Sequence, residues 1–184
     1  HMNTQPFLNL ICPLDNAPLT RVDSALVCSS GHSFDIAKKG YTNLLSVQHK
    51  RSLDPGDHKA MVAARKRFLN TGAYRHIADA VNQAAMPDDL QTGTISTLDA
   101  GCGEGYYLRE LAAAYREQPV ALLGVDISKW AVMAAASQDA RPDWIVGSNA
   151  RLPVATDTLD CVLCMFGFPV YEEFARVLKP GALL

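Results

Sequence analysis

One stretch near the middle of the chain constrains the fold more than any other. It runs from Thr97 to Tyr107 and reads TLDAGCGEGYY. Its apolar lead-in is typical of the end of a buried strand, three glycines follow at alternate positions, and a helical pattern begins at Tyr106. Because glycine adopts positive φ angles and has no Cβ to obstruct a ligand, this strand, turn and helix predict a binding loop.

The sequence on either side of this loop alternates between strand and helix patterns. A first strand is expected to begin at Ile95, a helix to cover residues 106–118, and a strand buried on both faces to cover residues 120–126. Ser128 is placed to cap the next helix. Further strands are predicted at residues 144–147 and 159–166, with a helix at 171–178 between the last of them and an apolar end. The fold class is therefore α/β, with a doubly wound parallel sheet.

The N-terminal part is short and rich in turns, and it carries two pairs of residues of metal-ligand type. These are Cys12 with Asp15, and Cys28 with His32. Tight turns of this kind bring four donors together around tetrahedral Zn²⁺, with two small strands beside them. Aspartate is a harder ligand than thiolate, so a ribbon held by packing alone stays open as the alternative. The odd count of five cysteines favours reduced thiols over disulfides.

A basic segment joins the N-terminal unit to the α/β part. Residues 36–76 hold nine basic and two acidic residues, although the whole chain has a net charge of −2. Two helices are predicted between residues 58 and 86, with a break at 70–72, and an Asp-Pro-Gly-Asp turn precedes them. Such a lopsided segment favours contact with phosphates over a merely solvated surface. The candidate RNA contacts are His49, Lys50, Arg51, Arg65, Lys66 and Arg67.

Length and composition limit the number of domains and the class of protein. A chain of 184 residues with 48% hydrophobic composition fits one domain with a small appendage, and no apolar run reaches the ~20 residues of a membrane span. We expect a soluble, cytoplasmic protein. Residues 1–2 look like a cloning remnant, 3–45 a ribbon unit, 46–94 a basic loop with linking helices, and 95–184 a cofactor-binding domain. The apolar end suggests the amino-terminal part of a longer protein.

The chemistry of the glycine turn distinguishes two kinds of cofactor. A dinucleotide fold uses G-x-G-x-x-G, whereas this chain has G-x-G-x-G with the carboxylates of Asp99 and Glu104 beside it. Negative charge there repels a diphosphate and suits an ammonium or sulfonium group, as in S-adenosylmethionine. Asp126 lies at the end of the next strand, the usual position of a carboxylate that accepts from ribose hydroxyls.

These residues resemble known enzymes. The stretches LDAGCGEG (98–105), GVD (124–126) and ARVLKPG (175–181) resemble the successive motifs of class I S-adenosylmethionine-dependent methyltransferases. The stretches CPL (12–14), the Cys28 to Asp35 run, GYTNLL (40–45), QHKRSLDPGD (48–57) and GEGYY (103–107) resemble those of the large-subunit ribosomal RNA (guanine-N1)-methyltransferases. The resemblance covers nearly all of the chain, and the ribbon with its basic loop is its most specific part.

The resemblance implies a Rossmann-like methyltransferase domain with a small N-terminal zinc ribbon that helps to grip a 23S ribosomal RNA hairpin. The implied zinc ligands are Cys12, Asp15, Cys28 and His32. The implied S-adenosylmethionine pocket contains Tyr74, Asp99, Gly101, Gly103, Gly105, Tyr107, Leu108, Asp126, Ile127, Asn149, Ala150 and Leu152. The chain departs from the family pattern at Asp15, where the family has cysteine, and at residues 167–169, after the fourth strand.

The implied reaction is in-line transfer of a methyl group to N1 of a guanine, with large-subunit ribosomal RNA as the partner. No residue stands out as the general base, so the catalytic residues stay unassigned, and a homodimer is left open. Two other functions also stay open. One is a methyltransferase of the same fold that acts on a small molecule, and the other is an RNA-binding remnant without turnover.

Overall fold

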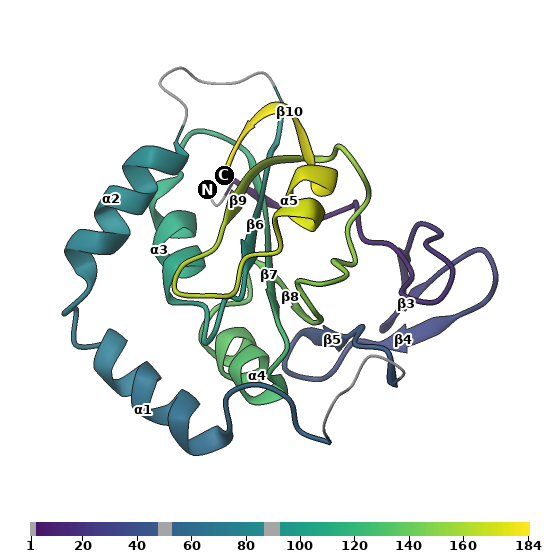
Figure 1. Ribbon diagram of the computed structural model, residues 1–184, viewed down its shortest axis with the longest axis horizontal. Coiled ribbons are helices and arrows are strands. Elements are labelled where there is room, and N and C mark those ends of the chain that lie inside the picture. The colour runs from purple at the N-terminus through teal and green to yellow at the C-terminus, as the bar shows by residue number, and fades with distance from the viewer. Residues whose placement is uncertain (1–2, 48–52, 87–92) are drawn as a thin grey trace.

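The computed structural model describes residues 3–47, 53–86 and 93–184. These residues form one seven-stranded sheet flanked by helices and a separate three-stranded sheet (Figure 1). The strands are β1 (Thr4–Gln5), β2 (Thr20–Val22), β3 (Ala25–Val27), β4 (Ser33–Asp35), β5 (Tyr41–Asn43), β6 (Ile95–Ala100), β7 (Val120–Asp126), β8 (Asp143–Val146), β9 (Leu159–Leu163) and β10 (Leu178–Leu183). The helices are α1 (Lys59–Leu69), α2 (Arg75–Ala85), α3 (Tyr106–Ala114), α4 (Lys129–Gln138) and α5 (Tyr171–Val177).

The large sheet has the order β10-β9-β6-β7-β8-β5, and β1 pairs with β7 outside this path. Every pairing in it is parallel. From β6 the chain moves through β7 to β8 on one side, and it returns to β9 and β10 on the other. The predicted doubly wound parallel sheet is therefore confirmed, and its topological switch point lies where β6 meets β9. In such sheets ligands bind at the carboxyl ends of the strands beside the switch point.

Alternate residues of β7 build the two halves of the core. Leu123 and Val125 pack on the face that also buries Phe174 of α5, whereas Leu122 packs on the opposite face with Leu111 of α3. Figure 1 shows the sheet between α3 and α5. All three leucines and the valine are fully buried. The apolar run at 120–126 therefore behaves as predicted for a strand covered on both sides.

Two predicted elements end earlier than expected. The helix that begins at Tyr106 stops at Ala114, where the backbone of Tyr115 becomes extended and its buried hydroxyl donates to the Ala85 carbonyl at 2.9 Å. Pro119 follows and disfavours helical backbone in the residue before it. Strand β9 stops at Leu163, so the predicted strand residues 164–166 belong to a loop instead.

Two short strands, β1 and β5, escape the sequence analysis. Both lie in the part expected to form the ribbon unit, but they pair in parallel with β7 and β8 of the large sheet. Segments of two and three residues carry no measurable hydrophobic period, so only their tertiary pairing reveals them. The N-terminal segment therefore contributes two strands to the large parallel sheet.

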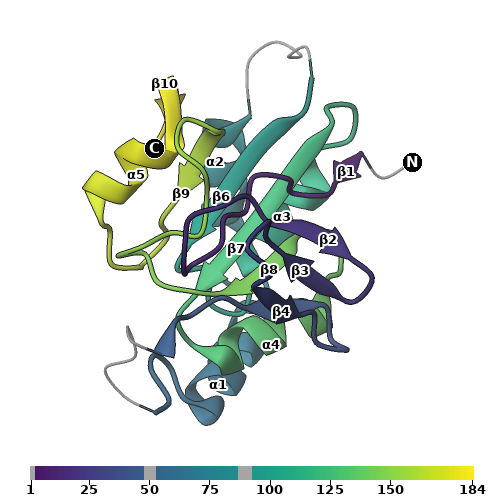
Figure 2. The ribbon, with the colours of Figure 1, turned by 90° about the vertical axis from the view of Figure 1, so that its right-hand side faces the viewer.

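The three-stranded sheet β2-β3-β4 lies over the same face as α5, as Figure 2 shows. Residues 147–158, which connect β8 to β9, contain no helix, and the N-terminal segment packs against them instead. Ile11 donates its N–H to the Pro153 carbonyl at 3.0 Å, and Ala155 donates to the Asn9 carbonyl at 2.9 Å. The ribbon thus covers a region where doubly wound folds usually place a crossover helix.

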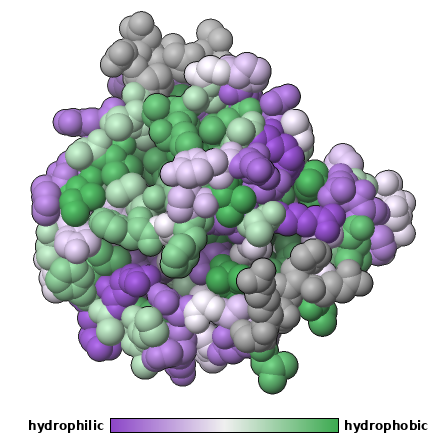
Figure 3. All heavy atoms as spheres, viewed as in Figure 1, coloured by the Kyte–Doolittle hydropathy of each residue, from purple (hydrophilic) through white to green (hydrophobic). Residues whose placement is uncertain are grey.

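An apolar groove of about 340 Å³ lies between α2 and the strands β9 and β10. Hydrophobic side chains gather over this part of the surface in Figure 3.

None of the helices in the described parts of the chain has the length and apolar character needed to cross a membrane.

Candidate functional site

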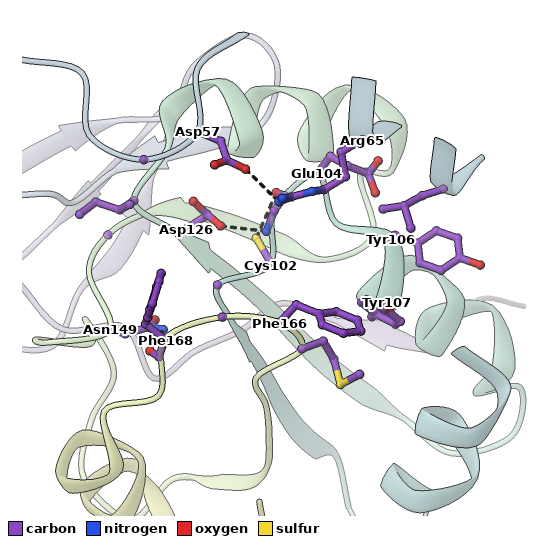
Figure 4. A pocket seen from close by; sticks show the side chains of 18 of the residues that line it. Asp57, Arg65, Cys102, Glu104, Tyr106, Tyr107, Asp126, Asn149, Phe166 and Phe168 are labelled. Carbon is purple, nitrogen blue, oxygen red and sulfur yellow. Dashed lines mark hydrogen bonds and ion pairs between the residues drawn. The ribbon is translucent and has the colours of Figure 1, made fainter. Parts of the chain in front are cut away.

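A cavity of about 660 Å³ opens at the carboxyl ends of β6 and β7 (Figure 4). The glycine turn and Asp126 form one side, the loops after β8 and β9 form another, and α1 lies across the opening. This is the position that the strand order predicts for a ligand site.

The glycine turn is held by the end of the neighbouring strand. Gly101 and Gly103 have φ angles of +88° and +56°. Gly103 donates its N–H to Asp126 Oδ2 at 2.9 Å, and Ser128 donates its N–H to Oδ1 at 2.8 Å. A Cβ on either Gly101 or Gly103 would project toward the cavity, with no heavy atom closer than 3.7 Å. The turn therefore leaves room for a ligand to approach the backbone.

Gly105 serves packing instead. It caps the N-terminus of α3 with a φ angle of +85°, and a Cβ there would lie 2.5 Å from the Trp144 ring. It does not line the cavity, in contrast to its place in the expected cofactor pocket.

Burial sets the ionisation of the two aspartates near the turn. Asp99 is 1% exposed, and burial, with a smaller effect from Asp126, raises the pKa of its carboxyl to about 7. Neither of its oxygens has a hydrogen-bond partner among the described residues. Burial also raises the pKa of Asp126, although the N–H groups of Ser128 and Gly103 oppose that rise. Buried acceptors without partners are expensive, and they mark a place where a ligand or water can supply a donor.

Glu104 needs a correction. The sequence analysis counts it as negative charge available at the turn, but its side chain is buried and its Oε2 accepts from Arg109 Nη2 at 3.0 Å and from Gln138 Nε2 at 2.6 Å. Its charge is neutralised inside the protein. The other carboxylates that line the cavity, those of Asp126 and Asp57, belong to residues that are partly exposed.

Aromatic side chains form the wall opposite Asp126. The Phe166 ring lies 6.2 Å from Tyr74 and 6.3 Å from Tyr107, measured between ring centroids, and Phe68 meets Tyr74 edge to face at 5.2 Å. Phe166 has a φ angle of +58°, which is unusual for a residue with a side chain. Phe168 in the same loop is 90% exposed. The cavity thus combines a polar side with a broad aromatic surface.

The cavity gathers eight of the twelve residues expected to bind the cofactor. These are Tyr74, Gly101, Gly103, Tyr107, Asp126, Ile127, Asn149 and Ala150. The other four do not line it: Asp99 is buried near the end of β6, Gly105 caps α3, and Leu108 and Leu152 are fully buried in the core. Their expected contact with a ligand is not seen in the cavity lining, because α3 and the loop after β8 turn these two leucines inward.

The expected RNA contacts separate into three groups. His49, Lys50 and Arg51 lie outside the described residues. On α1, Lys66 is partly exposed and Arg67 is exposed, while Arg65 lines the cavity and pairs with Asp57 at 2.9 Å. The sequence analysis missed Asp57, Phe166 and Phe168 as cavity residues, since no local pattern shows that α1 and the loop after β9 face each other.

The four expected metal ligands come together in the ribbon. Their donor atoms all lie within 4.8 Å of one another. His32 Nδ1 is 3.5 Å from Cys12 Sγ, 3.4 Å from Cys28 Sγ and 3.2 Å from Asp15 Oδ2. Tetrahedral Zn²⁺ with its usual bond lengths separates its ligand atoms by about 3.3–3.8 Å. The donor set and its spacing therefore fit a zinc ion.

This architecture is that of class I S-adenosylmethionine-dependent methyltransferases: a parallel sheet with a glycine turn after its central strand and an acidic residue ending the next. Residues 97–181 match the family described as methyltransferase domain, and residues 10–53 match the zinc-ribbon family described as RlmA, N-terminal. The chain is thus similar to these two families over those segments.

Curated relatives combine the same parts. A Streptomyces fradiae protein described as 23S rRNA (guanine(748)-N(1))-methyltransferase is 32% identical over 95% of this chain and 61% of its own length. A Micromonospora griseorubida protein assigned as a 23S rRNA (guanine-N1)-methyltransferase is 37% identical over 96% of this chain and 64% of its own length. The chain thus spans less than two thirds of the length of these relatives.

Solved structures support the fold alone. A protein from Methanococcus maripaludis, assigned as an S-adenosylmethionine-dependent methyltransferase, superposes with a TM-score of 0.55 at 18% identity, covering 72% of this chain and 65% of that one. A Haloferax volcanii complex of the Trm112 methyltransferase activator with a methyltransferase gives a TM-score of 0.51 at 24% identity, covering 69% and 59%.

Proposed function

We propose that this protein transfers a methyl group from S-adenosylmethionine to N1 of a guanine in a hairpin of 23S ribosomal RNA. The observation that carries the proposal is the joining, in one chain, of a class I methyltransferase cavity with an RlmA-type ribbon. Relatives that share both parts over most of this chain are described as 23S rRNA (guanine-N1)-methyltransferases.

The cavity fits the cofactor chemically. S-adenosylmethionine supplies an electrophilic methyl group on a sulfonium sulfur. Asp126 accepts two backbone N–H bonds, and a carboxylate has about four lone-pair sites, so two sites are left for ribose hydroxyls. Gly101 and Gly103 leave room for close approach of the methionine part, and we assign Asn149 and Ala150, which line the same cavity, to the adenine. We propose these residues, with Tyr74, Tyr107 and Ile127, as the cofactor-binding set.

The aromatic wall suits a nucleobase. Guanine N1 lies in the Watson–Crick edge, so the base must leave its stack before N1 can reach a buried methyl donor. Phe166 and Phe168 present exposed rings at the cavity mouth. Stacking of a base on an aromatic ring contributes about 1–3 kcal/mol without selecting its sequence. We propose that these two rings receive the extruded guanine, whose N1 proton must be lost during transfer.

In this proposal the phosphates of the RNA strand contact basic side chains of the protein. Lys66 and Arg67 follow Arg65 on α1, and because they are partly exposed and exposed respectively, their side chains are accessible to phosphates of the RNA. Together with His49, Lys50 and Arg51 we assign them to phosphate contact, alongside the ribbon. Such contacts make binding weaken steeply with salt.

The test is made on the natural protein. Deleting its gene should remove one reverse-transcription stop in 23S ribosomal RNA, because N1-methylguanine cannot pair, and complementation should restore that stop. Unchanged ribosomal RNA would overturn the proposed substrate. Unchanged RNA combined with S-adenosylhomocysteine binding to the purified protein would favour a small-molecule methyltransferase instead.

A further inference from the structure

One positive charge stands in an otherwise acidic cavity. Arg65 is the only cationic side chain among the described residues that line it, whereas Asp57 and Asp126 contribute carboxylates. The side chain comes from α1 and is 53% exposed, so it lies at the cavity surface rather than in the core.

The guanidinium stands beside the glycine turn. A Cβ built on Gly103 would lie 3.9 Å from Arg65 Nη1, and, apart from the adjacent residues of the chain, no other described heavy atom comes within 4 Å of that position. Figure 4 shows Arg65 reaching from α1 toward the turn, with its ion pair to Asp57. Arg65 therefore faces the part of the cavity next to Gly103 and Asp126.

A fixed loop holds Asp57 in place to orient this arginine. Ser128 Oγ donates to the Asp57 carbonyl at 2.5 Å, and Trp130 Nε1 donates to Asp54 Oδ2 at 2.9 Å. Gly56 packs so closely that a Cβ there would lie 2.9 Å from Ile127. The loop is thereby fastened to the start of α4, and Asp57 Oδ2 holds Arg65 Nη1 at 2.9 Å.

The charges of the cofactor favour a cationic side chain in this part of the cavity. Its amino-acid part carries an ammonium and a carboxylate, next to the sulfonium. The cavity carboxylates suit the two cations but repel the carboxylate, and Glu104 adds no free charge because Arg109 pairs with it. Resting on the proposed function, we infer that Arg65 binds the methionine carboxylate of the cofactor and that Asp57 positions its guanidinium. Arginine suits this role because its planar fork matches a carboxylate.

Two ligands separate this contact from the rest of the pocket. S-adenosylhomocysteine has the amino-acid part, and 5′-methylthioadenosine keeps the adenosine and sulfur but lacks it. Measured by calorimetry on the full chain, Arg65→Gln should weaken S-adenosylhomocysteine binding about ten- to hundredfold and leave methylthioadenosine within about twofold. Arg65→Lys should lose less, because it keeps the charge without the fork. Arg75→Gln is the matched control and should change neither, because Arg75 pairs with Asp79 and Glu110 and does not line the cavity.

The outcomes distinguish the inference from the proposed function. Equal weakening of both ligands by Arg65→Gln, or no weakening of S-adenosylhomocysteine, would overturn the role of Arg65. If Arg65→Gln and Arg67→Gln weakened only binding of an RNA hairpin, and equally, Arg65 would be a phosphate contact. Failure of the wild-type chain to bind either ligand would instead overturn the proposed function. Thermal unfolding of each variant checks the fold, and Arg65→Lys supplies the comparison if Arg65→Gln unfolds.

Discussion

Gly103 donates its backbone N–H to Asp126 Oδ2 at 2.9 Å, and this bond ties the glycine turn after β6 to the end of β7. The second oxygen of the same carboxylate accepts from Ser128 at the start of α4. One side chain therefore sets the relative position of the turn, the strand end and the next helix, in addition to facing the cavity.

Replacing Asp126 by Asn should damage binding more than folding. Asparagine keeps one acceptor and brings an NH₂ group toward a backbone N–H, so we expect a loss of about 1–3 kcal/mol in the free energy of unfolding. S-adenosylhomocysteine affinity, measured by calorimetry, should fall at least about tenfold, because the ribose acceptor is lost as well.

Asp160→Asn is the matched control for this variant. Asp160 Oδ2 accepts from the Ser96 N–H at 2.8 Å, but it lies near the opposite ends of the strands. It should cost comparable stability and leave ligand affinity unchanged. An equal loss of affinity in both variants would contradict the role given to Asp126.

The zinc affinity of the ribbon cluster should depend on Asp15, which is a less usual zinc ligand than cysteine. Thiolate is a softer and stronger zinc ligand than carboxylate, so Asp15→Cys should raise zinc affinity, whereas Cys12→Ser should lower it. Zinc content after dialysis against a chelator measures both effects. Cys164→Ser lies outside the cluster and should retain the metal like the wild type.

Removal of the metal should also weaken ligand binding in the cavity. Arg151, in the loop that carries Asn149, donates from Nη2 to Asn16 Oδ1 at 3.2 Å, and Asn16 closes the turn that holds Cys12. Chelation should therefore lower the melting temperature and weaken S-adenosylhomocysteine binding together. A metal-free wild-type chain with unchanged melting temperature would show that the cluster is not a metal site.

Asp99 should make stability depend on pH. Burial raises the pKa of this carboxyl to about 7 in the folded chain, so the folded state holds a proton that the unfolded state releases near pH 4. The stabilising contribution of the protonated form is full below pH 4 and is lost as pH rises to about 7.

The Asp99→Asn variant removes this titration. Its free energy of unfolding relative to the wild type, measured without ligand, should rise by up to about 4 kcal/mol between pH 4 and pH 8, since one pKa unit corresponds to about 1.4 kcal/mol. A difference that stays constant over this range would contradict the raised pKa.

Alanine should destabilise the protein more at Gly105 than at Gly72, because the two glycines have the same backbone conformation but only Gly72 has open space around it. Gly105 and Gly72 have φ angles of +85° and +82°, but a Cβ on Gly105 would meet Trp144 at 2.5 Å, while one on Gly72 has nothing within 4 Å. Gly72→Ala should cost about 1–2 kcal/mol from backbone strain. Gly105→Ala should cost about 1–3 kcal/mol more from overpacking, as measured by urea denaturation. Equal losses would contradict the clash.

Long elements and strong local patterns could be predicted from sequence. The run from Val120 to Asp126 is apolar up to its final carboxylate and forms strand β7, and Ser128 caps α4 by accepting from the Ala131 N–H at 3.2 Å. The spacing of Cys12, Asp15, Cys28 and His32 also anticipated the cluster, because tight turns determine locally where these side chains point. By contrast, β1 and β5 are too short to carry a period, and their strand conformation depends on pairing with distant partners.

The sequence by itself determined the parallel α/β sheet, the glycine turn with its second-strand carboxylate, and the pairs of metal-ligand residues, because each rests on side chains near one another in the chain. Only the tertiary structure decided which charged side chains are paired inside the protein and which face the cavity. It turned Glu104 inward to Gln138, brought Arg65 beside Gly103, and set Phe166 against Tyr74. These contacts join segments far apart in sequence, and their geometry follows from how the helices and loops pack on the sheet.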